Sequence, residues 1–117
     1  MNNNIEKGII GEEIACKYLM SKDYIILERN YRNKMGEIDI IAKNGELIVF
    51  VEVKTRTSTN YGYAYEAVNK KKQTKIINTA LCYIKQYNLK NFQFRFDIIE
   101  IYLGKENKIN HFEDAFV

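Results

Sequence analysis

The chain has 117 residues, of which 46% are hydrophobic and 13% aromatic, and it carries a formal net charge of +3. This length predicts one domain over residues 1–117, and the apolar content is too high for a disordered chain. No apolar run approaches the ~20 residues of a membrane span, and residues 1–4 (MNNN) do not resemble the start of a signal peptide. We therefore expect a cytoplasmic protein without a membrane partner.

Cysteine and histidine are too scarce for several kinds of site. Cys16 and Cys82 are the only cysteines and lack CxxC spacing, so neither a disulfide framework nor a thiolate metal centre is indicated. His111 is the single histidine, which excludes Ser-His-Asp and Cys-His arrangements. We expect His111 at the surface or half-buried.

The positive charge is concentrated in the middle of the chain. Residues 1–53 hold seven Lys and Arg against nine Asp and Glu, residues 54–95 hold nine against one, and residues 96–117 hold two against five. A segment of net charge +8 between acidic ends favours a surface that meets a polyanion. The alternative is an ordinary solvated helix face.

An amphipathic helix is predicted over residues 5–21. Ile5, Ile9, Cys16 and Leu19 recur at helical spacing, so they are expected to face a core, and Glu12 projects into the middle of their stripe. A buried carboxylate is costly unless a cation or hydrogen bonds receive it, which makes Glu12 a candidate functional residue. A second apolar stripe is available for the core or for a partner subunit: Ile10, Ile14 and Tyr18.

Strands are predicted over residues 24–31, 36–42 and 47–54, and Asn44-Gly45 is the expected two-residue turn of a hairpin between the last two. With that turn, Asp39 faces Phe50, Glu37 faces Glu52, and Asp39 lies diagonal to Glu52.

Alternation along the hairpin divides its side chains between two faces. One face is polar apart from Phe50: Glu37, Asp39, Phe50, Glu52 and Lys54. The other face is apolar: Ile38, Ile40, Leu47, Val49, Val51 and Val53. The polar face is either simply solvated or holds a cation, since carboxylates ~5 Å apart repel by about 3 kcal/mol at an effective dielectric of 20. Mg²⁺ is typically bound by one or two carboxylates with water and phosphate, and Asp39 and Glu52 offer such a pair.

The second half of the chain is predicted to supply the basic surface. A polar loop over residues 57–65 with three tyrosines leads into a helix over residues 66–87, whose Ile77, Leu81 and Ile84 are expected to face the core. Lysines crowd its opening turns, and Gln73 extends the core-facing line toward the carboxylates. Strands follow over residues 92–103 and 108–112, with Asp97 expected to support a basic residue.

Two motifs of the chain resemble those of a known protein family. Residues 36–41 (GEIDII) followed by residues 49–56 (VFVEVKTR) resemble the PD-(D/E)xK nuclease signature, and most closely its small YraN-type family. Gly8, Gly11-Glu12 and Ala15 resemble that family's first-helix motif, although Ile38 replaces the proline that names the wider signature. The resemblance implies an α/β restriction endonuclease-like fold, a mixed central sheet flanked by helices in the order helix, three strands, helix, two strands.

The resemblance also implies a chemistry. Asp39, Glu52 and Glu12 would hold one or two Mg²⁺ or Mn²⁺ ions, and Lys54 would orient a water molecule or stabilise the transition state. Lys54 could instead form a simple ion pair with Glu52. The residues expected to contact nucleic acid are Arg56, Lys70, Lys71, Lys72, Gln73 and Lys75.

The implied activity is metal-dependent endonuclease hydrolysis of DNA rather than RNA, on branched or damaged substrates, because the spacing is similar to that of archaeal Holliday junction resolvases. Since resolvases are dimeric, a homodimer is a secondary expectation. The alternatives are an inactive nucleic-acid-binding accessory protein and a protein-interaction module.

Overall fold

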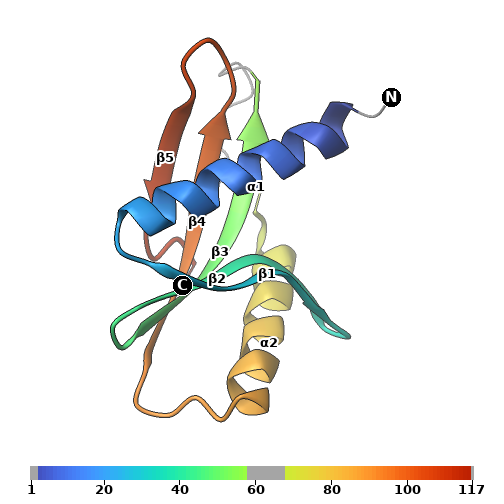
Figure 1. Ribbon diagram of the computed structural model, residues 1–117. Coiled ribbons are helices and arrows are strands. Elements are labelled where there is room, and N and C mark those ends of the chain that lie inside the picture. Colours follow the sequence, from blue (N-terminus) through green and yellow to red (C-terminus); the bar gives the residue numbers. More distant parts are fainter. Residues whose placement is uncertain (1–2, 58–67, 117) are drawn as a thin grey trace.

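The computed structural model describes residues 3–57 and 68–116. Two helices and five strands follow one another in the expected order, which is helix, three strands, helix, two strands (Figure 1). This order confirms the predicted α/β class. Their bounds are α1 (Asn3–Ser21), β1 (Ile25–Asn33), β2 (Gly36–Asn44), β3 (Leu47–Arg56), α2 (Lys70–Gln86), β4 (Gln93–Tyr102) and β5 (Lys108–Phe112). Within the described ranges, neither helix combines the length and the apolar character needed to cross a membrane.

The five strands form one mixed sheet in the order β1-β2-β3-β4-β5. All neighbouring pairs are antiparallel except β3 and β4, which run parallel. A parallel pair needs a long crossover connection, and the segment that contains α2 provides it. The two helices pack on opposite faces of the sheet, so both faces carry apolar side chains.

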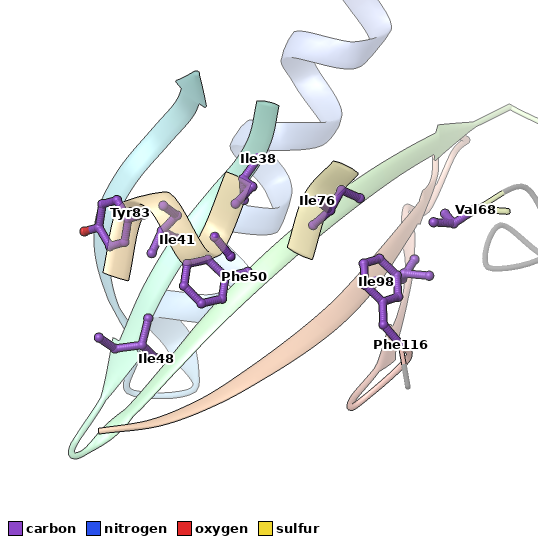
Figure 2. Packing of buried hydrophobic residues seen from close by; sticks show 10 residues of the cluster. Ile38, Ile41, Ile48, Phe50, Val68, Ile76, Tyr83, Ile98 and Phe116 are labelled. Carbon is purple, nitrogen blue, oxygen red and sulfur yellow. The ribbon is translucent and has the colours of Figure 1, made fainter. Parts of the chain in front are cut away.

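The core on the α2 side is built around Phe50 (Figure 2). Phe50 is 1% exposed, and its ring meets the ring of Tyr83 edge-on at 6.1 Å between centroids. The buried members of this core are Ile38, Ile41, Ile48, Phe50, Val68, Ile76, Ala80, Tyr83, Ile98 and Phe116. Two sequence expectations fail here, because Phe50 is not on a solvated face and Ile38 does not share a face with Ile40.

The alternation of β2 breaks at Asp39, which explains the position of Ile38. Ile40 belongs to the core on the α1 side, while Ile38 belongs to the core on the α2 side. Their partners on β1 are Arg29 and Tyr31, and Asn30 between them has a left-handed φ of 52°. Ile38 and Ile40 thus project to opposite faces although they are two residues apart.

The core on the α1 side uses only the second half of that helix. Three of its residues are buried against β2, β3 and β4: Ala15, Cys16 and Leu19. Core positions were predicted for Cys16 and Leu19. Ile5 and Ile9 are 61% and 62% exposed, so their predicted core positions are wrong. Figure 1 shows the reason, because the first turns of α1 extend past β3 and have no sheet beneath them. In the second stripe, Ile14 and Tyr18 pack against this core and Ile10 is 49% exposed.

The second helix begins later than predicted, at Lys70, after the N-cap residue Asn69, whose side chain accepts a hydrogen bond from Lys72 N. The predicted start, residues 66–67, and most of the tyrosine loop lie outside the described residues. Ile77 and Ile84 pack against the core as expected, but Leu81 is 56% exposed. The residues that α2 buries completely lie one position earlier along the helix: Ile76, Thr79, Ala80 and Tyr83.

The hairpin between β2 and β3 forms with a different turn from the one predicted. Asn44 pairs with Leu47, so the two turn residues are Gly45 and Glu46. Gly45 has a φ of 60°, the conformation that a type II′ turn needs at its first central position. The pairing is therefore shifted, and Phe50 lies opposite Ile41 instead of Asp39.

Candidate metal and nucleic-acid site

Asp39 and Glu52 lie where the pairing of β2 and β3 ends. The last paired residues are Ile40 and Val51, and Asp39 and Glu52 are the next residues on the two strands. Beyond that point the Val53 N–H donates to Asp39 Oδ2 at 2.7 Å, so a carboxylate receives a β3 amide where strand pairing stops. The corrected register thus places the two carboxylates more directly across from each other than the predicted diagonal arrangement.

A cavity of about 440 Å³ opens beside these carboxylates. It is lined by Asn4, Lys7, Gly8, Glu12, Asp39, Glu52, Val53, Lys54, Thr55, Arg56 and Thr57. The three acidic residues predicted as metal ligands therefore face one cavity, from α1, β2 and β3. Lys54 and Arg56 from the end of β3 share it.

A close crossing of α1 over β3 brings Glu12 to this cavity. A Cβ atom built on Gly11 would lie 1.9 Å from Thr55 Oγ1 and 2.9 Å from Thr55 Cβ, so the helix can approach this closely only with glycine at that position. Glu12 follows directly and forms a hydrogen bond with Asn30 on β1. Glu13 instead pairs with Arg29 at 3.0 Å on the surface.

Burial and mutual repulsion act on the carboxylates. Burial, together with the negative charge of Glu52, raises the pKa of Asp39 to about 7. Burial also raises the pKa of Glu12. Loss of hydration and like charge both disfavour the ionised form, and a divalent cation at the same place would offset both.

Two lysines form ion pairs with Glu52. Lys72 Nζ lies 3.1 Å from Glu52 Oε1, and Lys54 Nζ lies 3.7 Å from the same oxygen. Burial and the neighbouring Lys72 lower the pKa of Lys54. The ion pair between Lys54 and Glu52 that the sequence left as an alternative is present, but Lys72 from the first turn of α2 is the nearer partner.

The donor set fits a hard cation only in part. Within residues 3–57 and 68–116, no group of three or more Asp, Glu, His or Cys side chains is close enough to form a ready-made metal cage. Mg²⁺ usually keeps several water molecules and takes one or two carboxylates, and the Asp39 and Glu52 pair meets that requirement. Glu12 lines the same cavity but does not form a close group of three ligands with them.

The predicted basic residues divide into two groups. Arg56 lines the cavity, and its buried Nε has no hydrogen-bond partner within the described part of the chain. Lys70, Lys71 and Lys75 are exposed at the start of α2. Gln73 donates from Nε2 to the Val68 carbonyl at 3.0 Å, so its amide secures the entry to α2.

Lys7 is a cavity residue that the sequence analysis missed. It lies in the second turn of α1 and lines the cavity together with Gly8 and Glu12. On the helical projection Lys7 reads as an ordinary solvated lysine, so periodicity carried no signal for it. A tertiary crossing of α1 over the end of β3 is what turns it toward the site.

Asp97 lies outside this cavity and supports a basic residue, as expected. Arg95 donates from Nε and Nη2 to the two Asp97 oxygens, both at 2.8 Å. The sequence did not reveal that Asp97 Oδ2 also bonds His111 Nε2 at 2.7 Å, or that His111 Nδ1 bonds the Tyr18 hydroxyl at 2.9 Å. This network ties α1 to β4 and β5, and Asp114 N completes it at 3.0 Å.

Comparison with known proteins identifies the family. The sequence pattern of the uncharacterised protein family UPF0102 matches residues 11–101, which include Glu12, Asp39, Glu52 and Lys54. The chain belongs to family UPF0102. The UPF0102 protein of Clostridioides difficile (strain 630) is 54% identical, with 97% of this chain and 99% of the relative covered. The UPF0102 protein of Caldanaerobacter subterraneus is 53% identical, with 93% of each covered.

A third UPF0102 protein, from Alkaliphilus metalliredigens, is 50% identical over 93% of this chain and 96% of the relative. Membership of UPF0102 confirms the family predicted from residues 36–41 and 49–56. The names of these UPF0102 relatives give no activity, so the functional conclusion depends on the chemistry of the site.

Proposed function

We propose that this UPF0102 protein is a metal-dependent endonuclease that hydrolyses phosphodiester bonds in DNA. The observation that carries the proposal is the meeting of Asp39, Glu52 and Glu12 in one cavity whose other polar residues include the cations Lys7, Lys54 and Arg56. Acidic groups attract a divalent cation and the cations attract phosphate, which are the two requirements of metal-assisted phosphoryl transfer.

Each residue has a defined task in this proposal. Asp39 and Glu52 would hold one or two Mg²⁺ or Mn²⁺ ions, with Glu12 binding a coordinated water molecule. A bound cation of this kind supplies Lewis-acid polarisation of the phosphoryl oxygen and a water molecule of lowered pKa. Lys54, 3.7 Å from Glu52, donates a hydrogen bond to the attacking water or to a phosphate oxygen.

Arg56 supports substrate binding at the same cavity. Its side chain lines the cavity beside Lys54, so its guanidinium group can donate charge-assisted hydrogen bonds to a phosphate oxygen bound there. The exposed lysines of α2 extend the positive surface, and the proposed substrate is branched or damaged DNA. A homodimer stays part of the proposal on the resemblance to resolvases.

The second candidate function is nucleic-acid binding without hydrolysis. It is favoured by the 3.1 Å pair between Lys72 and Glu52 and by the lack of a third close carboxylate in the described part of the chain. In that case Lys72 neutralises Glu52 permanently, and the site binds phosphate without a metal.

Labelled junction, flap, single-stranded and duplex DNA, incubated with Mg²⁺ or Mn²⁺, separate the two functions. The nuclease proposal expects cleavage of at least one substrate, which Asp39→Asn and Glu52→Gln abolish and EDTA stops. Glu46→Gln, a control at the exposed turn between β2 and β3, should cleave normally. Tight DNA binding without cleavage would support the second function, and binding only to acidic proteins would overturn both.

A further inference from the structure

Three depressions of the surface lie in a row, because each shares lining residues with the next, and together they are called the groove here. The main cavity and a smaller one of about 180 Å³ share Asp39 and Glu52. The smaller cavity shares Gly36, Glu37 and Lys75 with a third depression of about 420 Å³ at the tip of the β1–β2 hairpin. The groove therefore runs from the α1 side of the carboxylates, past α2, to that hairpin.

The far end of the groove is basic. The third depression is lined by Arg32, Asn33, Lys34, Met35, Gly36, Glu37 and Lys75. Its one carboxylate, on Glu37, is paired with Arg32, which leaves the exposed Lys34 and Lys75 to set the sign of the local charge. Lys72 lines the groove between this depression and the carboxylates.

The hairpin tip is held against α2, which fixes the backbone position of Lys34. A Cβ on Gly36 would lie 2.8 Å from Thr79 Oγ1, and the φ of Gly36 is 155°, so only glycine allows this approach without strain. Asn33 donates to the Thr79 carbonyl at 3.3 Å and accepts from Met35 N at 2.8 Å. The backbone that carries Lys34 is therefore ordered before binding, and only the side chain has to be ordered by the contact.

We infer that the β1–β2 hairpin tip, through Lys34 with Lys75, is a second phosphate-binding site for the DNA strand that leaves the carboxylates. The inference rests on the proposed function and extends it, because cations then flank the carboxylates on both sides: Lys7 and Arg56 on one, Lys75 and Lys34 on the other. A strand held on both sides of the reacting phosphate is an internal stretch of a chain. This arrangement suits substrates without a free end at the site.

The separation along β2 sets the expected footprint. Three residue steps separate Gly36 from Asp39, which is about 10 Å at about 3.3 Å per residue. Lys34 lies two residues beyond Gly36, so the hairpin contact is expected within a few phosphates of the cleaved bond.

The test compares Lys34→Ala with Lys90→Ala, an equally exposed lysine beyond the opposite end of α2. DNA affinity is measured by fluorescence anisotropy over a range of salt, in EDTA so that hydrolysis cannot interfere. Lys34→Ala should lower the log–log salt slope by about 0.9, the value for one lost phosphate contact, and Lys90→Ala should leave it unchanged. Equal slopes for the two variants would overturn the inference.

A second measurement locates the contact on the DNA. One neutral methylphosphonate is placed in turn at each phosphate near the cleaved bond. A substitution a few phosphates away, on one side of the cleaved bond, should weaken binding by the wild-type protein and have no effect on Lys34→Ala. Additive losses at every position would refute the contact. Asp39-dependent cleavage, scored separately in Mg²⁺, tells whether the proposed function fails as well or only this extension of it.

Discussion

Replacing Gly11 with alanine tests the helix crossing that brings Glu12 to the site. The added Cβ would lie 1.9 Å from Thr55 Oγ1 and 2.9 Å from Thr55 Cβ. Rotation of the Thr55 side chain can remove the first conflict but not the second, because the Cβ position is fixed by the β3 backbone. Either α1 moves away from β3 or the contact stays compressed, and such overpacking costs about 1–3 kcal/mol.

Gly8→Ala is the matched control, since no atom lies within 4 Å of a Cβ at that position of the same helix. Both variants gain about 1 kcal/mol of helix propensity, so the difference between them isolates the steric term. Urea unfolding followed by circular dichroism should show Gly11→Ala about 1–3 kcal/mol less stable than Gly8→Ala.

A double-mutant cycle with Thr55→Ala should recover part of the loss, because it removes the Oγ1 and Cγ2 contacts. Equal stability of Gly11→Ala and Gly8→Ala would show that α1 and β3 do not approach as closely as described, and the placement of Glu12 would fail with it.

Two further predictions concern the lysines of α2 and the Asp97 network. Changing Lys70, Lys71 and Lys72 together to alanine should lower the salt slope of DNA binding by up to about 2.7, and an unchanged slope would remove α2 from the binding surface. Asp97→Asn should cost about 3–5 kcal/mol in urea unfolding, because it leaves Arg95 without its buried partner. Burial alone would raise the pKa of Asp97, but hydrogen bonds from His111, Arg95 and Asp114 N outweigh it and lower the pKa below that of an ordinary aspartate. The network's stabilisation is therefore present above the unfolded-state pKa of about 3.9 and is lost as pH falls through the lower folded value, so a carboxyl NMR midpoint that is not below the unfolded-state pKa would contradict it.

Local sequence patterns predicted the helices and strands well, but they did not predict which parts of each helix are buried against the sheet. Helical spacing found α1 and singled out Glu12, because a carboxylate on an apolar stripe is visible in one dimension. The same spacing assigned Ile5 and Ile9 to the core, because periodicity does not reveal where a helix runs beyond its sheet. The predicted core position of Leu81 was wrong for a related reason, because α2 buries a stripe that lies one residue earlier than the sequence suggested.

The candidate site was partly predictable because its carboxylates sit on a hairpin with a strong sequence signal. The turn moved from Asn44-Gly45 to Gly45-Glu46, yet this slip changes the sum of paired positions by two and keeps Asp39 and Glu52 on the same side. Lys7 and the partners of His111 could not be predicted, because they depend on how α1 lies across the sheet. No periodicity encodes a hydrogen bond between Tyr18 and His111, 93 positions apart.

Binding of Mn²⁺ in the absence of DNA tests most directly whether Asp39 and Glu52 form a cation site. Titration followed by electron paramagnetic resonance should show one or two ions bound to the wild-type protein. Asp39→Asn should weaken that binding by at least about 10-fold, the lower end of the loss seen for supporting residues of metal sites, while Glu46→Gln leaves it unchanged. No specific Mn²⁺ binding by the wild type, or equal binding by Asp39→Asn, would contradict the proposed enzyme.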